Sequence, residues 1–125
     1  MSGEMLSVQT TRIMVAKWRK ARLAGGEHVL GYPTTNVLDP THGVGTAQRV
    51  EELGLTDAQK VQEAVDQMHM PMRTTFEAWE LGLIRGDNAR NYSQRARALI
   101  LGLTWDAYRS RYDRAFRFVQ EHVEP

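Results

Sequence analysis

The stretch "LGLTWDAYRSRYDRAF", residues 101–116, decides how the C-terminal third of the chain is interpreted. Gly102 follows a helical run, and glycine is favoured where a turn needs a positive φ. Thr104 is a residue type that caps helices, and aromatic residues then recur at helical spacing with arginines between them. The stretch therefore predicts one of two structures: the turn and second helix of a helix-turn-helix, or a C-terminal helix packed on a small bundle.

The helix that follows Gly102 has two different faces. Apolar residues at spacings of four, three and four form a stripe that would dock on the preceding helix, where the small residue Ala98 lies four positions before the glycine. The stripe consists of Tyr108, Tyr112, Ala115 and Val119. The opposite face is polar and would enter the major groove of DNA. It consists of Asp106, Arg109, Ser110, Asp113, Arg114 and Arg117.

In a helix-turn-helix, the N-terminal end of the second helix reaches base edges. Here Arg109 would pair bidentately with guanine. Arg95, Arg97 and Arg117 would hold phosphates instead. The residues expected at a DNA interface are Arg95, Arg97, Thr104, Trp105, Asp106, Arg109, Ser110, Arg114 and Arg117.

Two residues fit this interpretation less well. Arg111 stands where many recognition helices have an apolar residue. Trp105 is unusual at an early recognition position, and the alternative is that it packs across the turn against Trp79 or Leu83. An ordinary helical hairpin also stays open as an interpretation of the whole stretch.

Helical periodicity extends through most of the remaining chain, and no stretch shows the alternation of a convincing β-strand. The helices are expected at 8–24, 46–53, 57–68, 71–83, 89–101 and 104–122. A long loop with several glycines and prolines, residues 25–45, follows the first helix. The sequence therefore predicts an all-α fold in one domain, 1–125. It would be a small bundle of five to six helices, with an acidic middle (46–84) and the helix-turn-helix at 85–122.

The net charge is only +1, yet the charge is unevenly distributed. Residues 12–22 hold five basic and no acidic residues, and residues 27–80 hold nine acidic and three basic ones. Residues 85–118 hold eight arginines and three aspartates. Two basic ends around an acidic middle suggest an anionic partner for the ends, with solvated helix faces as the alternative for any one cluster.

Catalysis and metal binding find little support in the sequence. The chain has no cysteine, which excludes disulfides and thiolate metal sites and fits a reducing cytoplasm. Its four histidines, His28, His42, His69 and His122, are scattered without ligand spacing. No apolar run approaches the roughly 20 residues that span a bilayer, and the N-terminus lacks the apolar segment of a signal peptide. We therefore expect a cytoplasmic protein that is not an enzyme, holds no metal or other cofactor, and has no membrane partner.

The order of the motifs is itself distinctive. A basic helix containing tryptophan, "VAKWRKAR" (15–22), precedes "LGYP" (30–33), "TDAQKVQEAVDQM" (56–68), "FEAWELGL" (76–83) and the C-terminal run from 96 to 119. This order resembles phage antitermination proteins of the Q type. It resembles, more loosely, phage late regulators whose C-terminal region is similar to sigma-factor region 4. The likeness covers most of residues 11–119 and lies in spacing and element order.

The resemblance implies a function. Proteins of this type bind double-stranded DNA within a phage late promoter, load onto a paused bacterial RNA polymerase, and let it read through terminators in the host cell. It implies that the helix from Thr104 reads DNA, and that the acidic middle faces the polymerase, with or without its sigma factor. Basic residues of the first helix would contact the DNA backbone or nascent RNA: Lys17, Arg19, Lys20 and Arg22. The lambda branch of the family carries a cysteine zinc site, so the implied kinship is with a zinc-free branch.

Two other functions remain open on the same residues. A conventional DNA-binding phage regulator or a packaging subunit would use the same helix-turn-helix. A helical protein-interaction adaptor would not read DNA, and would grip its partner through the acidic middle or the methionine-rich segment 68–72.

Overall fold

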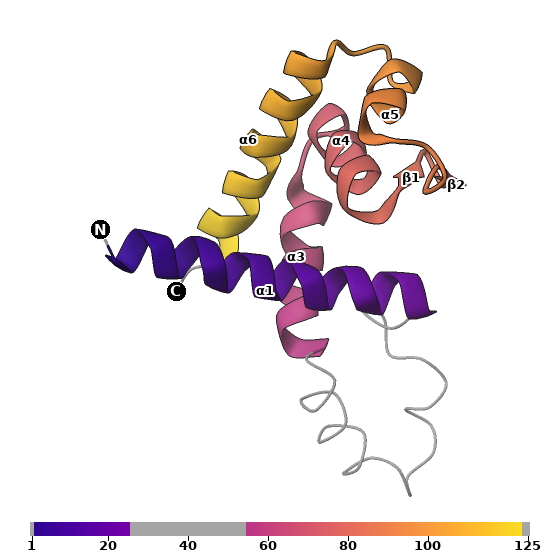
Figure 1. The fold of residues 1–125 in the computed structure, drawn as a ribbon. Coiled ribbons are helices and arrows are strands. Elements are labelled where there is room, and N and C mark those ends of the chain that lie inside the picture. Colours follow the sequence, from indigo (N-terminus) through magenta and orange to yellow (C-terminus); the bar gives the residue numbers. More distant parts are fainter. Residues whose placement is uncertain (1, 26–54, 124–125) are drawn as a thin grey trace, which may run out of the picture. The chain divides into compact units, whose positions relative to one another are not determined.

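Figure 1 shows the computed structural model of the chain, in which the described residues form helices and one short hairpin. The structure describes residues 2–25 and 55–123. The elements are α1 (Ser2–Gly25), α3 (Leu55–Gln67), α4 (Met70–Leu81), β1 (Leu83–Ile84), β2 (Asp87–Asn88), α5 (Gln94–Ile100) and α6 (Trp105–Val123). The prediction of a small all-α fold is confirmed. The predicted loop 25–45, apart from Gly25, and the predicted helix 46–53 lie outside the described residues.

The chain divides into two compact units, where the sequence predicted a single domain. One unit runs to Glu63 and the other begins at Ala64. Helix α3 therefore begins in the first unit and ends in the second.

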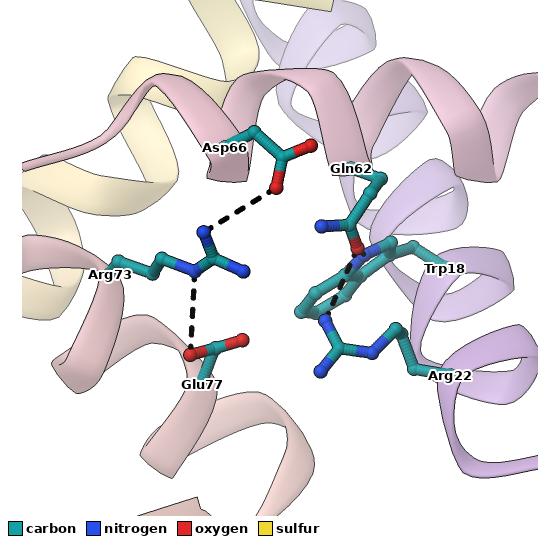
Figure 2. Close-up of polar contacts among 6 residues, drawn as sticks. All are labelled: Trp18, Arg22, Gln62, Asp66, Arg73 and Glu77. Carbon is teal, nitrogen blue, oxygen red and sulfur yellow. Dashed lines mark hydrogen bonds and ion pairs between the residues drawn. The ribbon is translucent and has the colours of Figure 1, made fainter. Parts of the chain in front are cut away.

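The first unit is built around Trp18 of α1, whose side chain is fully buried. Its indole Nε1–H donates to Oε1 of Gln62 on α3 over 2.8 Å, and Arg22 donates to the same oxygen over 3.2 Å (Figure 2). A buried amide is costly unless it is hydrogen-bonded, and these two donors satisfy the Gln62 oxygen. The other buried apolar residues repeat at helical spacing along both helices: Met14, Val15, Ala21, Ala58 and Val61.

Helix α4 provides the central apolar face of the second unit and packs against α5, α6 and β1. Pro71 lies in its first turn, as predicted, because the fixed φ of proline suits that position. The helix ends at Gly82, whose φ of 65° lies in the left-handed region and whose N–H donates to the carbonyl of Ala78. The predicted end at Leu83 was therefore wrong, and Leu83 belongs to β1.

The hairpin is the feature that the sequence analysis did not find. Strands β1 and β2 pair antiparallel, with Leu83 opposite Asn88 and Ile84 opposite Asp87. The two residues between them, Arg85 and Gly86, have φ values of 52° and 89°, as a type I′ turn requires. Strands of two residues are too short to show an alternating pattern.

Helix α5 begins at Gln94, five residues later than the predicted start at Ala89. The hydroxyl of Ser93 accepts a hydrogen bond from the N–H of Ala96 over 3.1 Å and so caps the helix. Ala89 is buried, and its N–H donates to the carbonyl of Gly82 over 2.6 Å. That bond is made to the end of α4, so Ala89 closes the hairpin instead of starting a helix.

Candidate nucleic-acid interface

A tight glycine turn joins α5 to α6. Gly102 has a φ of 74°, a conformation that residues with a side chain rarely adopt. Its N–H donates to the carbonyl of Leu99, and the N–H of Leu103 donates to the carbonyl of Ala98, each over 2.9 Å. These two bonds form a Schellman motif, which satisfies the last carbonyls of α5. The predicted turn at Gly102 is confirmed.

Thr104 begins α6 as a capping residue. Its hydroxyl oxygen accepts a hydrogen bond from the N–H of Ala107 over 3.2 Å, which satisfies one of the unpaired donors of the first turn. The predicted cap is confirmed. The Thr104 hydroxyl, which was expected at the DNA interface, accepts this hydrogen bond within the protein.

The predicted docking stripe of α6 is buried. Tyr108, Ala115 and Val119 have no exposed surface, and Tyr112 is half-buried. The stripe was expected to dock on the preceding helix, α5, but α6 packs mainly on α4. The ring of Trp79 on α4 stacks on Tyr112 at a centroid distance of 4.3 Å and an interplanar angle of 16°. Such ring pairs stabilise a helix contact beyond the area they bury. This packing fixes which face of α6 is turned outward.

A hydrogen-bond chain through Gln94 ties α6 to α5 and α4. The hydroxyl of Tyr108 donates to Oε1 of Gln94 over 2.7 Å, and Nε2 of Gln94 donates to the carbonyl of Trp79 over 3.1 Å. Burial raises the pKa of Tyr108 to about 12, Arg97 opposes this rise, and the carboxylate of Glu80 adds to it. The raised pKa keeps the hydroxyl protonated, and so a donor, to a higher pH than an exposed tyrosine would allow.

The outward face of α6 is polar and exposed, as predicted. It carries Asp106, Arg109, Ser110, Asp113, Arg114 and Arg117. In the part of the chain that the structure describes, none of its three arginines forms an ion pair. Their guanidinium groups can therefore meet an anionic partner without breaking an internal contact.

Arg97 was expected at a phosphate, and the structure corrects this. Its guanidinium donates to three backbone carbonyls, those of Ala78 (3.1 Å), Ala89 (3.0 Å) and Arg90 (3.3 Å). Arg97 is half-buried, and its guanidinium is directed to these carbonyls. We therefore assign it a structural role.

Trp105 packs across the turn, which was the alternative open to it. Its half-buried ring stacks on Trp79 at a centroid distance of 5.9 Å and an interplanar angle of 22°. The guanidinium of Arg95 lies over the same ring, 4.7 Å from its centroid, and Arg95 itself is exposed. Both Arg95 and Trp105 were expected to contact DNA. In the structure Arg95 is at the surface, and the half-buried ring of Trp105 packs beneath its guanidinium.

The basic residues of α1 also separate into two groups. Nζ of Lys17 pairs with the carboxylate of Asp57 over 2.9 Å, and Arg22 lies over the ring of Trp18 while it donates to Gln62. Arg19 and Lys20 are exposed, as expected for contacts with a nucleic-acid backbone. Arg12 is exposed as well. The sequence-based set omitted it, although it belongs to the same basic run.

The acidic middle uses much of its charge within the protein. Besides Asp57, the carboxylates of Asp66 and Glu77 lie 3.4 and 3.6 Å from the guanidinium of Arg73 (Figure 2). Glu80 accepts a hydrogen bond from the hydroxyl of Tyr112. The acidic surface offered as polymerase-facing is therefore smaller than the sequence suggests.

Residues 2–25 and 55–123 contain no group of three or more histidine, cysteine, aspartate or glutamate residues placed to hold a metal ion. No helix in this part of the chain is both long enough and apolar enough to cross a membrane. His28 and His42 lie outside the described residues.

Comparisons of the chain with protein-family models, with curated proteins and with solved structures gave no match.

Proposed function

We propose that the chain is a phage late-gene transcription antiterminator that binds promoter-proximal double-stranded DNA through α5 and α6 and modifies RNA polymerase to read through terminators. One observation carries the DNA-binding part of this proposal. The turn at Gly102 joins α5 to an α6 that is buried along one stripe and exposes a polar, arginine-bearing face along the other. A helix with this division of faces suits the major groove.

The residues at the N-terminal half of α6 would read bases. Arg109 would donate to the O6 and N7 atoms of guanine, and Asp106 and Ser110 flank it on the exposed face. Arg114 and Arg117, farther along α6, and Arg95, on α5, would contact phosphates. On α1, Arg19 and Lys20 would contact the DNA backbone or nascent RNA. These partners place the protein in the cytoplasm of the bacterial host.

The antitermination part rests on the resemblance of motif order to the Q-type proteins. A gel shift of fragments from the protein's own genomic neighbourhood, with random DNA as competitor and salt varied, tests DNA binding. Arg109→Ala is the matched variant, and it should lose preference for the specific fragment. Transcription past a terminator downstream of that fragment then tests antitermination. Specific binding without read-through would assign the protein to the conventional DNA-binding regulators or the packaging subunits.

A protein-interaction adaptor is the second candidate, and exposed apolar side chains favour it. Tyr92, Leu99 and Ile100, in and just before α5, are 54%, 76% and 48% exposed. Leu99 and Ile100 are consecutive, and contiguous exposed apolar surface often marks a contact with another protein. If the protein is an adaptor, it should bind no nucleic acid at physiological salt. Absence of any band at low salt, with and without added polymerase, would favour it over the antiterminator.

A further inference from the structure

Arg95, an exposed residue of α5, contacts Trp105 at the start of α6, the helix proposed to read bases. The guanidinium of Arg95 lies 4.7 Å from the centroid of the Trp105 ring, within the range of a cation–π interaction. The ring itself is held in place, because it stacks on Trp79 and lies 6.0 Å from the ring of Tyr108, which is fully buried. An exposed arginine thus lies against a packed aromatic cluster.

This arrangement places two positive charges at one end of α6. Trp105 and Arg109 are four residues apart on the helix, so their side chains are neighbours on its surface. The guanidinium of Arg95 therefore lies over a ring whose residue precedes Arg109 by about one helical turn of α6. Both arginines are exposed, and neither forms an ion pair within residues 2–25 and 55–123.

We propose that Trp105 is a positioning residue, which holds the guanidinium of Arg95 in place for contact with a phosphate of double-stranded DNA. The inference rests on the proposed DNA-binding function and deepens it. In a helix-turn-helix, the first helix crosses the DNA backbone while the second enters the groove, so α5 is the helix expected at a phosphate. A long, exposed side chain loses rotamer freedom when it binds, and a side chain already held in one conformation loses less. Trp105 acts through Arg95 and contacts no base.

The test uses a mixed-sequence DNA duplex, because a phosphate contact does not depend on sequence. Binding of the full chain would be measured by fluorescence anisotropy over a series of salt concentrations. Each phosphate contact contributes about 0.9 to the slope of log K against log salt. We expect Arg95→Gln to lower the slope by about this amount, and Trp105→Leu to lower it by a similar amount. In the Arg95→Gln background, Trp105→Leu should have no further effect.

Three controls separate the outcomes. Trp105→Phe keeps an aromatic ring over which Arg95 can lie, so it should keep most of the salt slope that Trp105→Leu loses. Arg85→Gln, at the tip of the hairpin, removes the same charge elsewhere and should leave the slope unchanged. Circular dichroism would verify that each variant is folded.

An unchanged salt slope in Arg95→Gln overturns the inference. It is also overturned if Trp105→Leu weakens binding further in the Arg95→Gln background, because Trp105 would then act independently of Arg95. Failure of the wild-type protein to bind the duplex even at low salt is a different result. It overturns the proposed function, and the inference with it.

Discussion

Arg97 caps the C-terminal end of α4 from the neighbouring helix α5: its Nη1 donates to the carbonyl oxygen of Ala78 over 3.1 Å. The same guanidinium holds the backbone after the hairpin through the carbonyls of Ala89 and Arg90. One side chain therefore joins the end of α4, the hairpin and α5. This contact replaces the phosphate contact that the sequence suggested for Arg97.

Arg97→Met should destabilise the protein, because it removes the charged donor of three hydrogen bonds. The carbonyls of Ala78 and Ala89 keep their bonds from the N–H groups of Gly82 and Tyr92, whereas the carbonyl of Arg90 loses the guanidinium. Hydrogen bonds from charged groups contribute about 1.5–3 kcal/mol each, and partial exposure reduces this, so we expect a loss of about 1–2 kcal/mol in the free energy of unfolding. Urea denaturation followed by circular dichroism would measure it. Arg95→Met is the matched control, since Arg95 is exposed on the same helix, and it should change stability by less than about 0.5 kcal/mol. Equal losses in the two variants would contradict the structural role of Arg97.

Because of Tyr108, the free energy of unfolding of the second unit should fall at alkaline pH. Burial raises its pKa to about 12, whereas a tyrosine in an unfolded chain has a pKa of about 10. Below pH 10 both states keep the proton, and the contribution to stability is complete. Between pH 10 and 12 the unfolded state ionises and the folded state does not, so stability falls as the pH rises.

The measurement is the free energy of unfolding at pH 8 and pH 11 for the wild type and for Tyr108→Phe. We expect the wild type to lose about 1 kcal/mol more than the variant over this range. At pH 8 the variant should be less stable by about 1 kcal/mol, because the hydrogen bond to Gln94 is lost. Parallel decreases in the two proteins would mean that the titration of Tyr108 has no influence on folding.

Glycine is needed at position 102 because of its backbone conformation, and not because a side chain would lack room. A Cβ atom added there would meet nothing within 4 Å, but the φ of 74° is strained for any residue with a side chain. Gly102→Ala should therefore cost about 1–2 kcal/mol of stability. Gly102→Asn should cost less, because asparagine adopts the left-handed region more readily. Thermal unfolding of both variants would test this order, and an alanine variant as stable as the wild type would refute it.

The parts of the fold with strong helical periodicity could be predicted from the sequence. The stripe of α6 was identified because its four members repeat at helical spacing, and the structure buries three of them. The cap at Thr104 and the turn at Gly102 follow from local preferences of those residue types. Local chemistry decides such features, so a single sequence contains them.

The segment 83–93 could not be predicted in the same way. Its two strands have two residues each, and Ala89 in "DNARNYS" suggests a helix as readily as a turn. What decides the structure is tertiary: the N–H of Ala89 and the guanidinium of Arg97 bond to the end of α4. For the same reason, the sequence could not show that Arg95 faces outward and Arg97 inward, two residues apart.

Arg109 and Lys20 should respond differently to removal if the proposed function is right. Arg109→Ala removes a base contact and should cost about 1–3 kcal/mol on the specific site while leaving random DNA almost unaffected. Lys20→Ala removes a backbone contact and should weaken binding to all sequences alike, with a salt slope lower by about 1. Lys17→Ala is the matched control on α1, because Lys17 is paired with Asp57, and it should bind as the wild type does. Competition binding with specific and random duplexes measures all three. If Arg109→Ala loses affinity equally on both duplexes, Arg109 contacts phosphate, and another residue of the α6 face reads the bases.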